Sequence, residues 1–383
     1  MALTILNLFK ESVEYNLATF LPKIQCKPVT GAAFSIARYK IKIDFFHELN
    51  KLLYNHIKTL PPKLWNGFRL VAGDGTTISL PATPDIKNHF KIYETSKGNT
   101  HTVLANCCIF YDVLSNFVVD VNLDLMSNGE LPMVSELIDR AEFTNTIVLL
   151  DRGFGYFATC KRLLNKKLDF CIRLKACGST FAKEALSNPS NDFITEWIPS
   201  ETSRLSNKKH DLDVNPILVR ITKITLNTGE IEVLVSSLLD LKQIKEADIK
   251  ELYSLRWGVE EGIKKLKPRM KLEQFGCRKQ QGVYQEFYAH IFMMNLVTLI
   301  GNETQEEIDR VTIKRKNAYK YNWQNAFRFV RNQFVSLFHL GDVQRSVEKL
   351  NEQIQASLTI IKPGRSFERH KDKRKHRYAQ CYK

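Results

Sequence analysis

The chain has 383 residues, 44% of them hydrophobic, and a formal net charge of +15. This length allows two or three domains with sizeable cores, and the charge favours a polyphosphate partner, with a solvated basic surface as the alternative. Apolar runs such as TIVLLD are too short to cross a bilayer and the first residues lack a signal-peptide pattern, so we exclude a membrane protein and expect a cytoplasmic one. The eight cysteines form no zinc-binding pattern, and we expect reduced thiols.

Residues 1–66 are predicted to be helical. The segment TGAAFSIARYKIKIDFFHEL begins at an N-cap residue, Thr30, and carries apolar residues near helical spacing. Its exposed face would present Arg38, Lys40 and Lys42. We interpret residues 1–66 as a DNA-binding region in which Arg38 and Lys40 contact DNA, while an amphipathic packing helix explains the same pattern almost as well.

Strands begin at Phe68, with FRLVAGDGTTISL, TVLANCCIFYDV and NFVVDVNLDL. The helix MVSELIDRA, the buried strand TIVLLD, the helix YFATCKRLLNKK and the strand DFCIRLK follow. The order β-β-β-α-β-α-β over residues 67–175 is typical of a ribonuclease H-like core, an α/β fold with a mixed sheet and flanking helices.

Residues 176–242 interrupt this core with turn-forming residues and alternating segments, which indicates a β-rich insertion. Helical periodicity resumes in residues 243–300, the second part of the core, and continues through a C-terminal region at 301–361. The tail at 362–383 holds eight Lys or Arg against two acids and is predicted to be a disordered basic arm.

The helical segment LYSLRWGVEEGIKKLKPRM at 252–270 has an unusual polar face. On a regular helix Tyr253, Arg256, Glu260 and Lys267 fall within an arc of roughly 60°, beside a stripe of apolar residues. A carboxylate among two cations and a phenol suits metal-dependent phosphodiester chemistry. The alternative is an ordinary i,i+4 ion pair of Arg256 with Glu260 on a solvated face.

Two further acids lie at strand-like positions. Asp74 is bounded by glycines in AGDGTT, and Asp151 ends the apolar strand TIVLLD before a glycine-bearing turn. Each is well placed for a pocket, and each alone is explained equally well as a turn or capping residue. Glu261 points away from the polar face on the same helical wheel, so Glu260 is the expected partner of these aspartates.

The motifs DGTTISLP, DRGFGYF, CIRLK and Y-x2-R-x3-E-x6-K resemble those of the DDE transposases of the insertion-sequence family conventionally numbered four. The resemblance runs from about Phe68 to about Leu299. It implies a metal-binding triad of Asp74, Asp151 and Glu260, and it implies that Tyr253, Arg256 and Lys267 hold the DNA backbone.

The resemblance also implies that the protein binds terminal inverted repeats as a homodimer, cleaves them and joins them to target DNA in the bacterial nucleoid. Oxygen ligands favour Mg²⁺, with Mn²⁺ as a substitute and two ions in the site. Lys264 would add a phosphate contact, and Trp197 would either stack on an extruded base or belong to the core. A catalytically inactive DNA-binding relic and another ribonuclease H-like nuclease, such as a junction resolvase, remain as alternatives.

Overall fold

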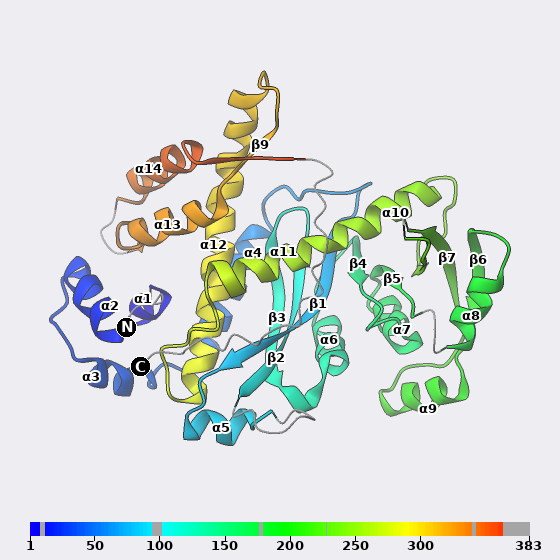
Figure 1. Ribbon diagram of the computed structural model, residues 1–383, viewed down its shortest axis with the longest axis horizontal. Coiled ribbons are helices and arrows are strands. Elements are labelled where there is room, and N and C mark those ends of the chain that lie inside the picture. The colour runs from blue at the N-terminus through cyan, green and yellow to red at the C-terminus, as the bar shows by residue number, and fades with distance from the viewer. Residues whose placement is uncertain (8–11, 94–101, 176–178, 227, 339–341, 363–383) are drawn as a thin grey trace. The chain divides into compact units, whose positions relative to one another are not determined.

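The computed structural model describes residues 1–7, 12–93, 102–175, 179–226, 228–338 and 342–362 (Figure 1). The chain forms two compact units. The helical unit comprises Met1–Leu60, Ile78–Ala105 and Lys264–Lys383, and the sheet unit comprises Pro61–Thr77 and Asn106–Ile263. The segment predicted as the second part of the core, 243–300, therefore contributes to both units.

A mixed eight-stranded sheet has the strand order β3-β2-β1-β4-β5-β8-β7-β6. The strands β1, β4 and β5 are parallel, whereas β5, β8, β7 and β6 pair antiparallel. The strands are β1 Arg69–Leu80, β2 Val103–Asp112, β3 Phe117–Leu125, β4 Thr146–Leu150, β5 Asp169–Arg173, β6 Asp192–Trp197, β7 Ile217–Thr225 and β8 Ile231–Ser236. The predicted ribonuclease H-like order of the first five strands is confirmed, and the wholly buried β4 is typical of a parallel strand.

Two helices of the sheet unit pack on opposite faces of β2. The Cys108 thiol contacts the backbone oxygen of Glu130, the first residue of α6 (Glu130–Asp139), at 3.7 Å. The ring of Tyr111 instead lies against Gly262 in α11 (Gly258–Lys264). Because successive side chains of a strand point to opposite faces, residues 108 and 111 place α6 and α11 on different faces.

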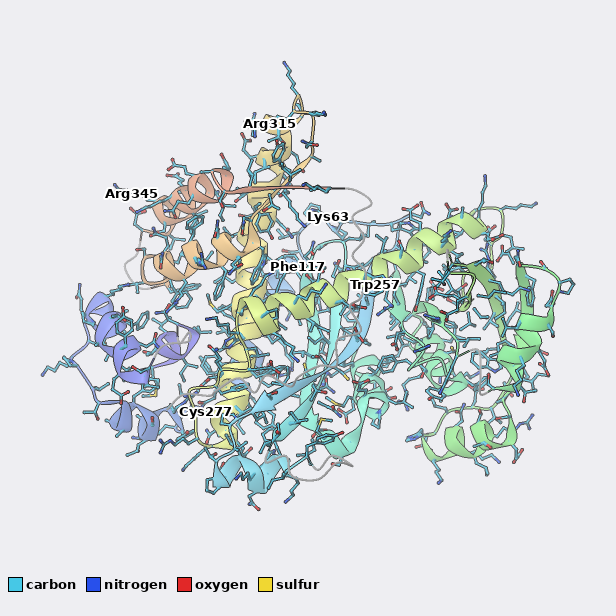
Figure 2. All side chains as sticks on the ribbon, in the orientation of Figure 1. Lys63, Phe117, Trp257, Cys277, Arg315 and Arg345 are labelled. Atoms are coloured by element: carbon cyan, nitrogen blue, oxygen red, sulfur yellow. The ribbon has the colours of Figure 1, made fainter. Side chains whose placement is uncertain are left out.

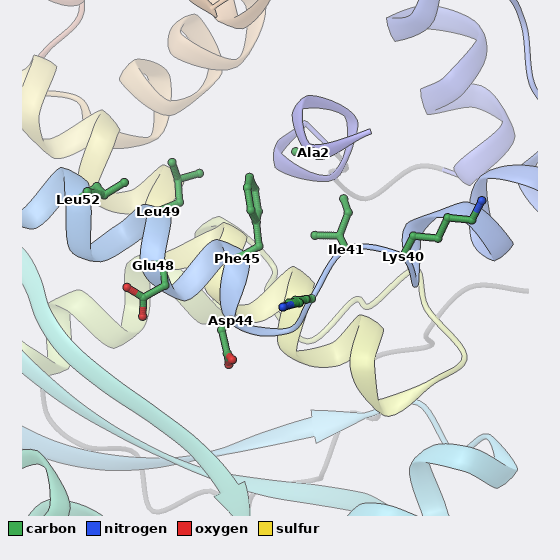
Figure 3. Close-up of a pocket in the computed structure, with 9 residues that line it drawn as sticks. Ala2, Lys40, Ile41, Asp44, Phe45, Glu48, Leu49 and Leu52 are labelled. Carbon is green, nitrogen blue, oxygen red and sulfur yellow. The ribbon is translucent and has the colours of Figure 1, made fainter.

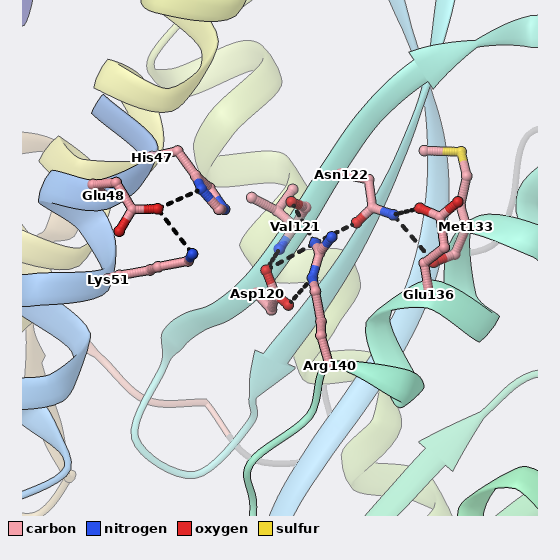
Figure 4. Close-up of polar contacts among 9 residues, drawn as sticks. All are labelled: His47, Glu48, Lys51, Asp120, Val121, Asn122, Met133, Glu136 and Arg140. Atoms are coloured by element: carbon pink, nitrogen blue, oxygen red, sulfur yellow. Dashed lines mark hydrogen bonds and ion pairs between the residues drawn. The ribbon is translucent and has the colours of Figure 1, made fainter. Parts of the chain in front are cut away.

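A polar cluster fastens α6 to β3 (Figure 4). Arg140 donates to both carboxylate oxygens of Asp120, at 2.5 and 3.0 Å, and also to the side-chain oxygen of Asn122. Asn122 in turn donates to the backbone of Met133 and to the carboxylate of Glu136. The middle and the C-terminal end of α6 are thereby fixed against β3. In the helical unit, a separate surface group in the same figure pairs Glu48 with His47 and Lys51.

The insertion at 176–242 differs from the prediction, because it contains helices as well as strands. It holds α8 (Thr180–Ser187) and α9 (Glu201–Lys209), and its three strands extend the main sheet through the pairing of β8 with β5. Ser179 and Ser200 cap the two helices by accepting from the backbone N–H three residues on. These serines were part of the polar clusters that we interpreted as turns.

The segment at 252–270 is a helical run whose winding changes twice. After α10 (Glu246–Ser254), residues Leu255–Trp257 form a 3-10 turn before α11, and Lys265–Arg269 form a π-helical turn. A helical wheel of constant pitch therefore describes only part of this segment.

The helical unit is organised around α12 (Gln280–Thr312), which is buried along most of its length. Figure 1 shows α13 and α14 beside it, and among the described residues no helix is long and apolar enough to span a membrane. The remaining helices and strands are α1 Ala2–Leu6, α2 Val13–Phe20, α3 Gly31–Arg38, α4 Asp44–Ile57, α5 Pro84–Phe90, α7 Phe157–Asn165, β9 Tyr319–Tyr321, α13 Trp323–Phe338, α14 Val343–Gln355 and β10 Leu358–Ile360, with 3-10 turns at Leu21–Ile24 and Met126–Asn128. Helices at both chain ends agree with the prediction, and the tail from 363 onward lies outside the described residues.

The predicted single helix beginning at Thr30 is two helices, α3 and α4. Thr30 does cap α3 through the backbone N–H of Ala33, but Arg38 is not on an exposed face. Its side chain is 1% exposed and pairs with Glu286 at 2.8 Å. The expected exposed face is therefore wrong for Arg38, which is buried with Glu286, and its expected contact with DNA stays a prediction.

Lys40 is exposed, as expected, and lines a pocket of about 590 Å³ in the helical unit (Figure 3). Apolar side chains including Ile41, Phe45 and Leu49 form much of its wall, and Asp44 and Glu48 add acids to it. This mixture of charges does not match a phosphate site.

Candidate active site

The sheet brings Asp74 and Asp151 side by side. In the parallel ladder of β1 and β4, Ala72 is paired with Leu149. Asp74 lies two residues beyond Ala72 in β1, and Asp151 lies two residues beyond Leu149, directly after β4, so both follow the same end of the parallel pairing. Asp151 directly follows β4, so it lies at the carboxyl end of that strand.

Glycines on both sides of Asp74 allow close packing on the other face of β1. A Cβ at Gly73 would lie 2.5 Å from the side chain of Leu150, and one at Gly75 would lie 2.3 Å from the carboxyl group of Glu130. Both are shorter than real Cβ contacts, so side chains are in contact with the bare backbone there. The AGDGTT sequence therefore fixes Asp74 on the face opposite α6.

Arg256 links Asp74 to Glu260. Its guanidinium lies 3.3 Å from Glu260 Oε1 and 3.9 Å from Asp74 Oδ2. The i,i+4 pair of Arg256 with Glu260 that we considered from the sequence is thus present. It does not lie on a solvated face, because Arg256 is only 8% exposed and also contacts an aspartate of the sheet. Arg256 Nε is buried without a hydrogen-bond partner, so the guanidinium retains an unused donor.

The approach of α11 to the sheet depends on two glycines of the helix. A Cβ at Gly258 would lie 2.9 Å from Val113, and one at Gly262 would lie 2.9 Å from the ring of Tyr111. Both Val113 and Tyr111 belong to the end of β2 or its turn. Small residues at this spacing let the backbone carrying Glu260 lie directly on the sheet.

The pKa of the Asp74 carboxyl responds to both of the other predicted acids. It is raised to about 6, mainly by burial and also by Asp151 and Glu260, while Arg256 and the Gly75 N–H act to lower it. A carboxylate raises the pKa of another acid in this way when the two lie near each other. The three acids predicted from separate motifs therefore form one cluster in the sheet unit.

Replacing Asp74 by Asn should stabilise the protein at about pH 8 by roughly 1–3 kcal/mol and change little at about pH 4. A carboxyl whose folded-state pKa is raised contributes stability below its unfolded pKa, and this contribution is lost as the pH rises through about 6. Chemical denaturation at both pH values measures the difference. Asp120→Asn, which breaks the bidentate pair with Arg140, is the control and should not stabilise at either pH. Equal effects of Asp74→Asn at both pH values would contradict the buried, repelled carboxylate.

Other residues of the predicted polar face have different surroundings. Tyr253 is 8% exposed with Arg256 over its ring, and burial is the main cause that raises the pKa of its phenol. Lys264 is exposed. Lys267 lies in the helical unit, where it pairs with Glu273 at 3.3 Å.

Trp197 is 6% exposed in the sheet unit. The ring of Phe181 stacks on it at 4.3 Å between centroids, and Phe157 meets it edge-on. Such packing is typical of a core residue, and a base could stack on the covered face only if Phe181 moved.

Two residues near the cluster were not found from the sequence. Trp257, labelled in Figure 2, is 47% exposed and lies beneath the Arg256 guanidinium at 5.6 Å. Glu130 lies against Gly75, and its pKa is raised by burial and by Asp151. Trp257 lies inside the Y-x2-R-x3-E motif, so its position next to Arg256 could have identified it. Glu130 follows Gly129 and belongs to no motif that could have identified it.

The donor set of Asp74, Asp151 and Glu260 suits a hard divalent cation, since it offers carboxylate oxygens without sulfur or imidazole. Within the ranges that the structure describes, no three Asp, Glu, His or Cys side chains are assembled as ligands of one ion. The chemistry of the cluster therefore fits a metal, and Arg256 is the cation in contact with two of its members.

Comparisons with known proteins show the family of the chain. Residues 65–296 match the family model described as a transposase DDE domain, which covers more than half of the chain. The chain therefore belongs to the DDE-domain transposase family. Transposase InsG for insertion sequence element IS4 of Escherichia coli strain K12 is 25% identical over 243 residues, covering 62% of this chain and 53% of that protein. The chain thus spans about half the length of this curated relative.

A solved structure, the piggyBac transposase synaptic complex with hairpin DNA, matches with 12% identity and a TM-score of 0.46 over 91% of this chain and 69% of that one.

Proposed function

We propose that the protein is a cut-and-paste DNA transposase that binds the inverted repeats of its own element and uses Asp74, Asp151 and Glu260 for strand cleavage and strand transfer. The observation that carries this proposal is the ion-paired contact of Arg256 with both Asp74 and Glu260, beside the end of the β1–β4 pairing that Asp151 follows. Membership of the DDE transposase family supports the same activity. A homodimer in the DNA complex and action on DNA in the bacterial cytoplasm complete the proposal.

The carboxylates would hold Mg²⁺, or Mn²⁺ as a substitute, and two such ions would polarise the scissile phosphate and lower the pKa of the attacking water or hydroxyl. Asp74 must be deprotonated to act as a ligand. Its raised pKa therefore favours activity above about pH 6. The aspartates are fixed by strands and Glu260 by a helix packed on the sheet, which limits the movement of each ligand.

Arg256, Tyr253, Lys264 and Lys267 would hold the DNA backbone. Arg256 has a buried, unused donor at Nε, and a planar guanidinium suits a phosphate oxygen pair. The phenol of Tyr253 stays neutral at physiological pH and is a hydrogen-bond donor. In the free protein Lys267 is paired with Glu273, so DNA would compete with that carboxylate for the ammonium.

Incubating the purified chain with a DNA fragment that carries the element's ends tests the proposal. In the presence of Mg²⁺ we expect cleavage at the ends that leaves 3′-hydroxyl groups, and joining of these ends to a supercoiled target plasmid. EDTA should abolish both reactions, and scrambled ends should not be cut. Binding of the ends without any cleavage in Mg²⁺ or Mn²⁺ would contradict the proposed activity and identify a DNA-binding relic.

Lys267→Ala should weaken binding to the ends and reduce the slope of log affinity against log salt by about one unit, because one phosphate contact is lost. Fluorescence anisotropy at several salt concentrations measures both. Lys250→Ala, which removes an exposed charge from α10, is the matched control. If both variants change the slope equally, Lys267 makes no specific phosphate contact.

A further inference from the structure

A second concentration of positive charge lies in the helical unit, where α12 turns into β9. Five exposed cations form what we call the β9 basic surface: Lys314, Arg315, Lys316, Lys320 and Lys362. The sequence contains no Asp or Glu between Asp309 and Asp342. Figure 2 shows Arg315 at the end of α12. The β9 basic surface shares no residue with the carboxylate cluster, and the proposed strand cleavage does not use it.

The strands that carry this surface are anchored on α12. Tyr321 is packed against Gly301, where a Cβ would lie 2.4 Å from the phenol ring. Gln305 donates to the backbone oxygen of Tyr319 at 2.9 Å and accepts from the N–H of Tyr321 at 3.0 Å. The pairing of β9 with β10 adds a second strand. The backbone of β9 is therefore fixed to α12 by two hydrogen bonds, one that the Gln305 side chain donates and one that it accepts.

The same contacts determine where the cations point. Tyr321 faces α12, so the alternation of a strand turns Lys320 to the other face. The backbone N–H of Arg315 donates to Thr312 at 2.8 Å, and its guanidinium lies 5.2 Å from the ring centroid of Tyr319. The backbone N–H of Ile361 donates to the backbone oxygen of Ala318 at 2.9 Å, so Lys362 follows a residue that is bonded to the segment between α12 and β9.

Two acids in the last turns of α12 have partners of their own. Glu307 pairs with Arg310, and Asp309 accepts from the side chain of Gln305 at 2.7 Å. The β10 strand contains no acid. The cations of the β9 basic surface thus share an ordered backbone and a local excess of positive charge.

We propose that the β9 basic surface is a second DNA-binding surface, which holds the phosphate backbone of duplex DNA without reading its sequence. Cationic side chains on a fixed backbone lose less backbone conformational entropy on binding than those on a flexible segment. Each phosphate contact also releases a counterion. The proposal depends on the chain acting on DNA, and it does not depend on the carboxylate triad. Through the β9 basic surface the protein would also bind DNA outside the terminal repeat.

The test compares full-length variants in binding to a random-sequence duplex of about 30 base pairs, at salt concentrations from about 50 to 300 mM. The loop variant carries Lys314→Gln, Arg315→Gln, Lys316→Gln and Lys320→Gln. Its salt slope should be shallower by about 3 units and its affinity near 100 mM salt lower by about a hundredfold. A charge-conserving variant, with each Lys changed to Arg and Arg315→Lys, should keep the wild-type slope.

The control variant has the same change in net charge on exposed lysines elsewhere: Lys23→Gln, Lys27→Gln, Lys208→Gln and Lys209→Gln. Equal losses in the loop and control variants would overturn the proposal, because net charge alone would explain the binding. A larger loss of binding to vesicles of anionic phospholipid than to DNA would overturn it in favour of a membrane surface. Asp151→Asn should retain the full salt slope on the same duplex, so failure of the triad and failure of this surface are distinguishable.

Discussion

Asp74→Asn, Asp151→Asn and Glu260→Gln should each slow metal-dependent cleavage of the element's ends by at least about a hundredfold to a thousandfold. Each change keeps the shape of the side chain and removes its negative charge, so the loss would report a missing oxygen ligand. Binding of the uncut ends should remain within about threefold, since the phosphate contacts come from other side chains. Single-turnover cleavage and anisotropy on the same DNA measure the two quantities.

Glu261→Gln is the matched control for this prediction. Glu261 is the exposed neighbour of Glu260 on the same helix, and its replacement changes the local charge equally. We expect near wild-type cleavage from it. Wild-type cleavage by any of the three triad variants would remove that residue from the site, and loss of cleavage in Glu261→Gln would mean that charge near α11, not ligation, limits the reaction.

Gly262→Ala should destabilise the protein by about 1–3 kcal/mol and slow cleavage by about tenfold to a hundredfold. The added methyl group would lie 2.9 Å from the ring of Tyr111, which is fully buried and cannot rotate away without disturbing its neighbours. The helix must therefore move off the sheet, and Glu260 must move with it. Urea denaturation and end cleavage measure the two effects.

The control for the glycine is Gly276→Ala, where a Cβ would lie 3.7 Å from Val13 and 3.8 Å from Glu286, which are ordinary contacts. Its stability should stay within about 0.5 kcal/mol of the wild type. If Gly262→Ala were as stable and as active as this control, close packing of α11 would not be what positions Glu260.

The three acids could be predicted from the sequence because each lies in a local pattern. Glycines bound Asp74, a largely apolar strand precedes Asp151, and Glu260 shares a helical face with basic residues. Strand register then brings the two aspartates together without further information. Such patterns can be recognised in a sequence because they depend on the strand or helix that carries the residue, and not on packing against distant segments.

Features that depend on tertiary contacts could not be predicted in the same way. The burial of Arg38 requires Glu286, which is 248 residues away along the chain. The 3-10 and π-helical turns on either side of α11 change the pitch of the helical run, and Tyr253 and Arg256, which the regular wheel placed on a polar face, are each only 8% exposed. Glu130 packs against the backbone of Gly75, a contact that the absence of a side chain at Gly75 allows. Polar clusters around Ser179 and Ser200 were read as turns although they also contain helix caps.

Iron-directed cleavage of the polypeptide tests the central claim most directly. Fe²⁺ occupies oxygen-ligand sites that take Mg²⁺, and with peroxide and ascorbate it generates radicals that cut the chain near its ligands. If Asp74, Asp151 and Glu260 hold a shared metal site, the DNA-bound protein should be cut near all three positions, and excess Mg²⁺ or Glu260→Gln should suppress all three cuts together. Cuts near only one of the three, or cuts that persist in Glu260→Gln, would contradict a single site formed by these carboxylates.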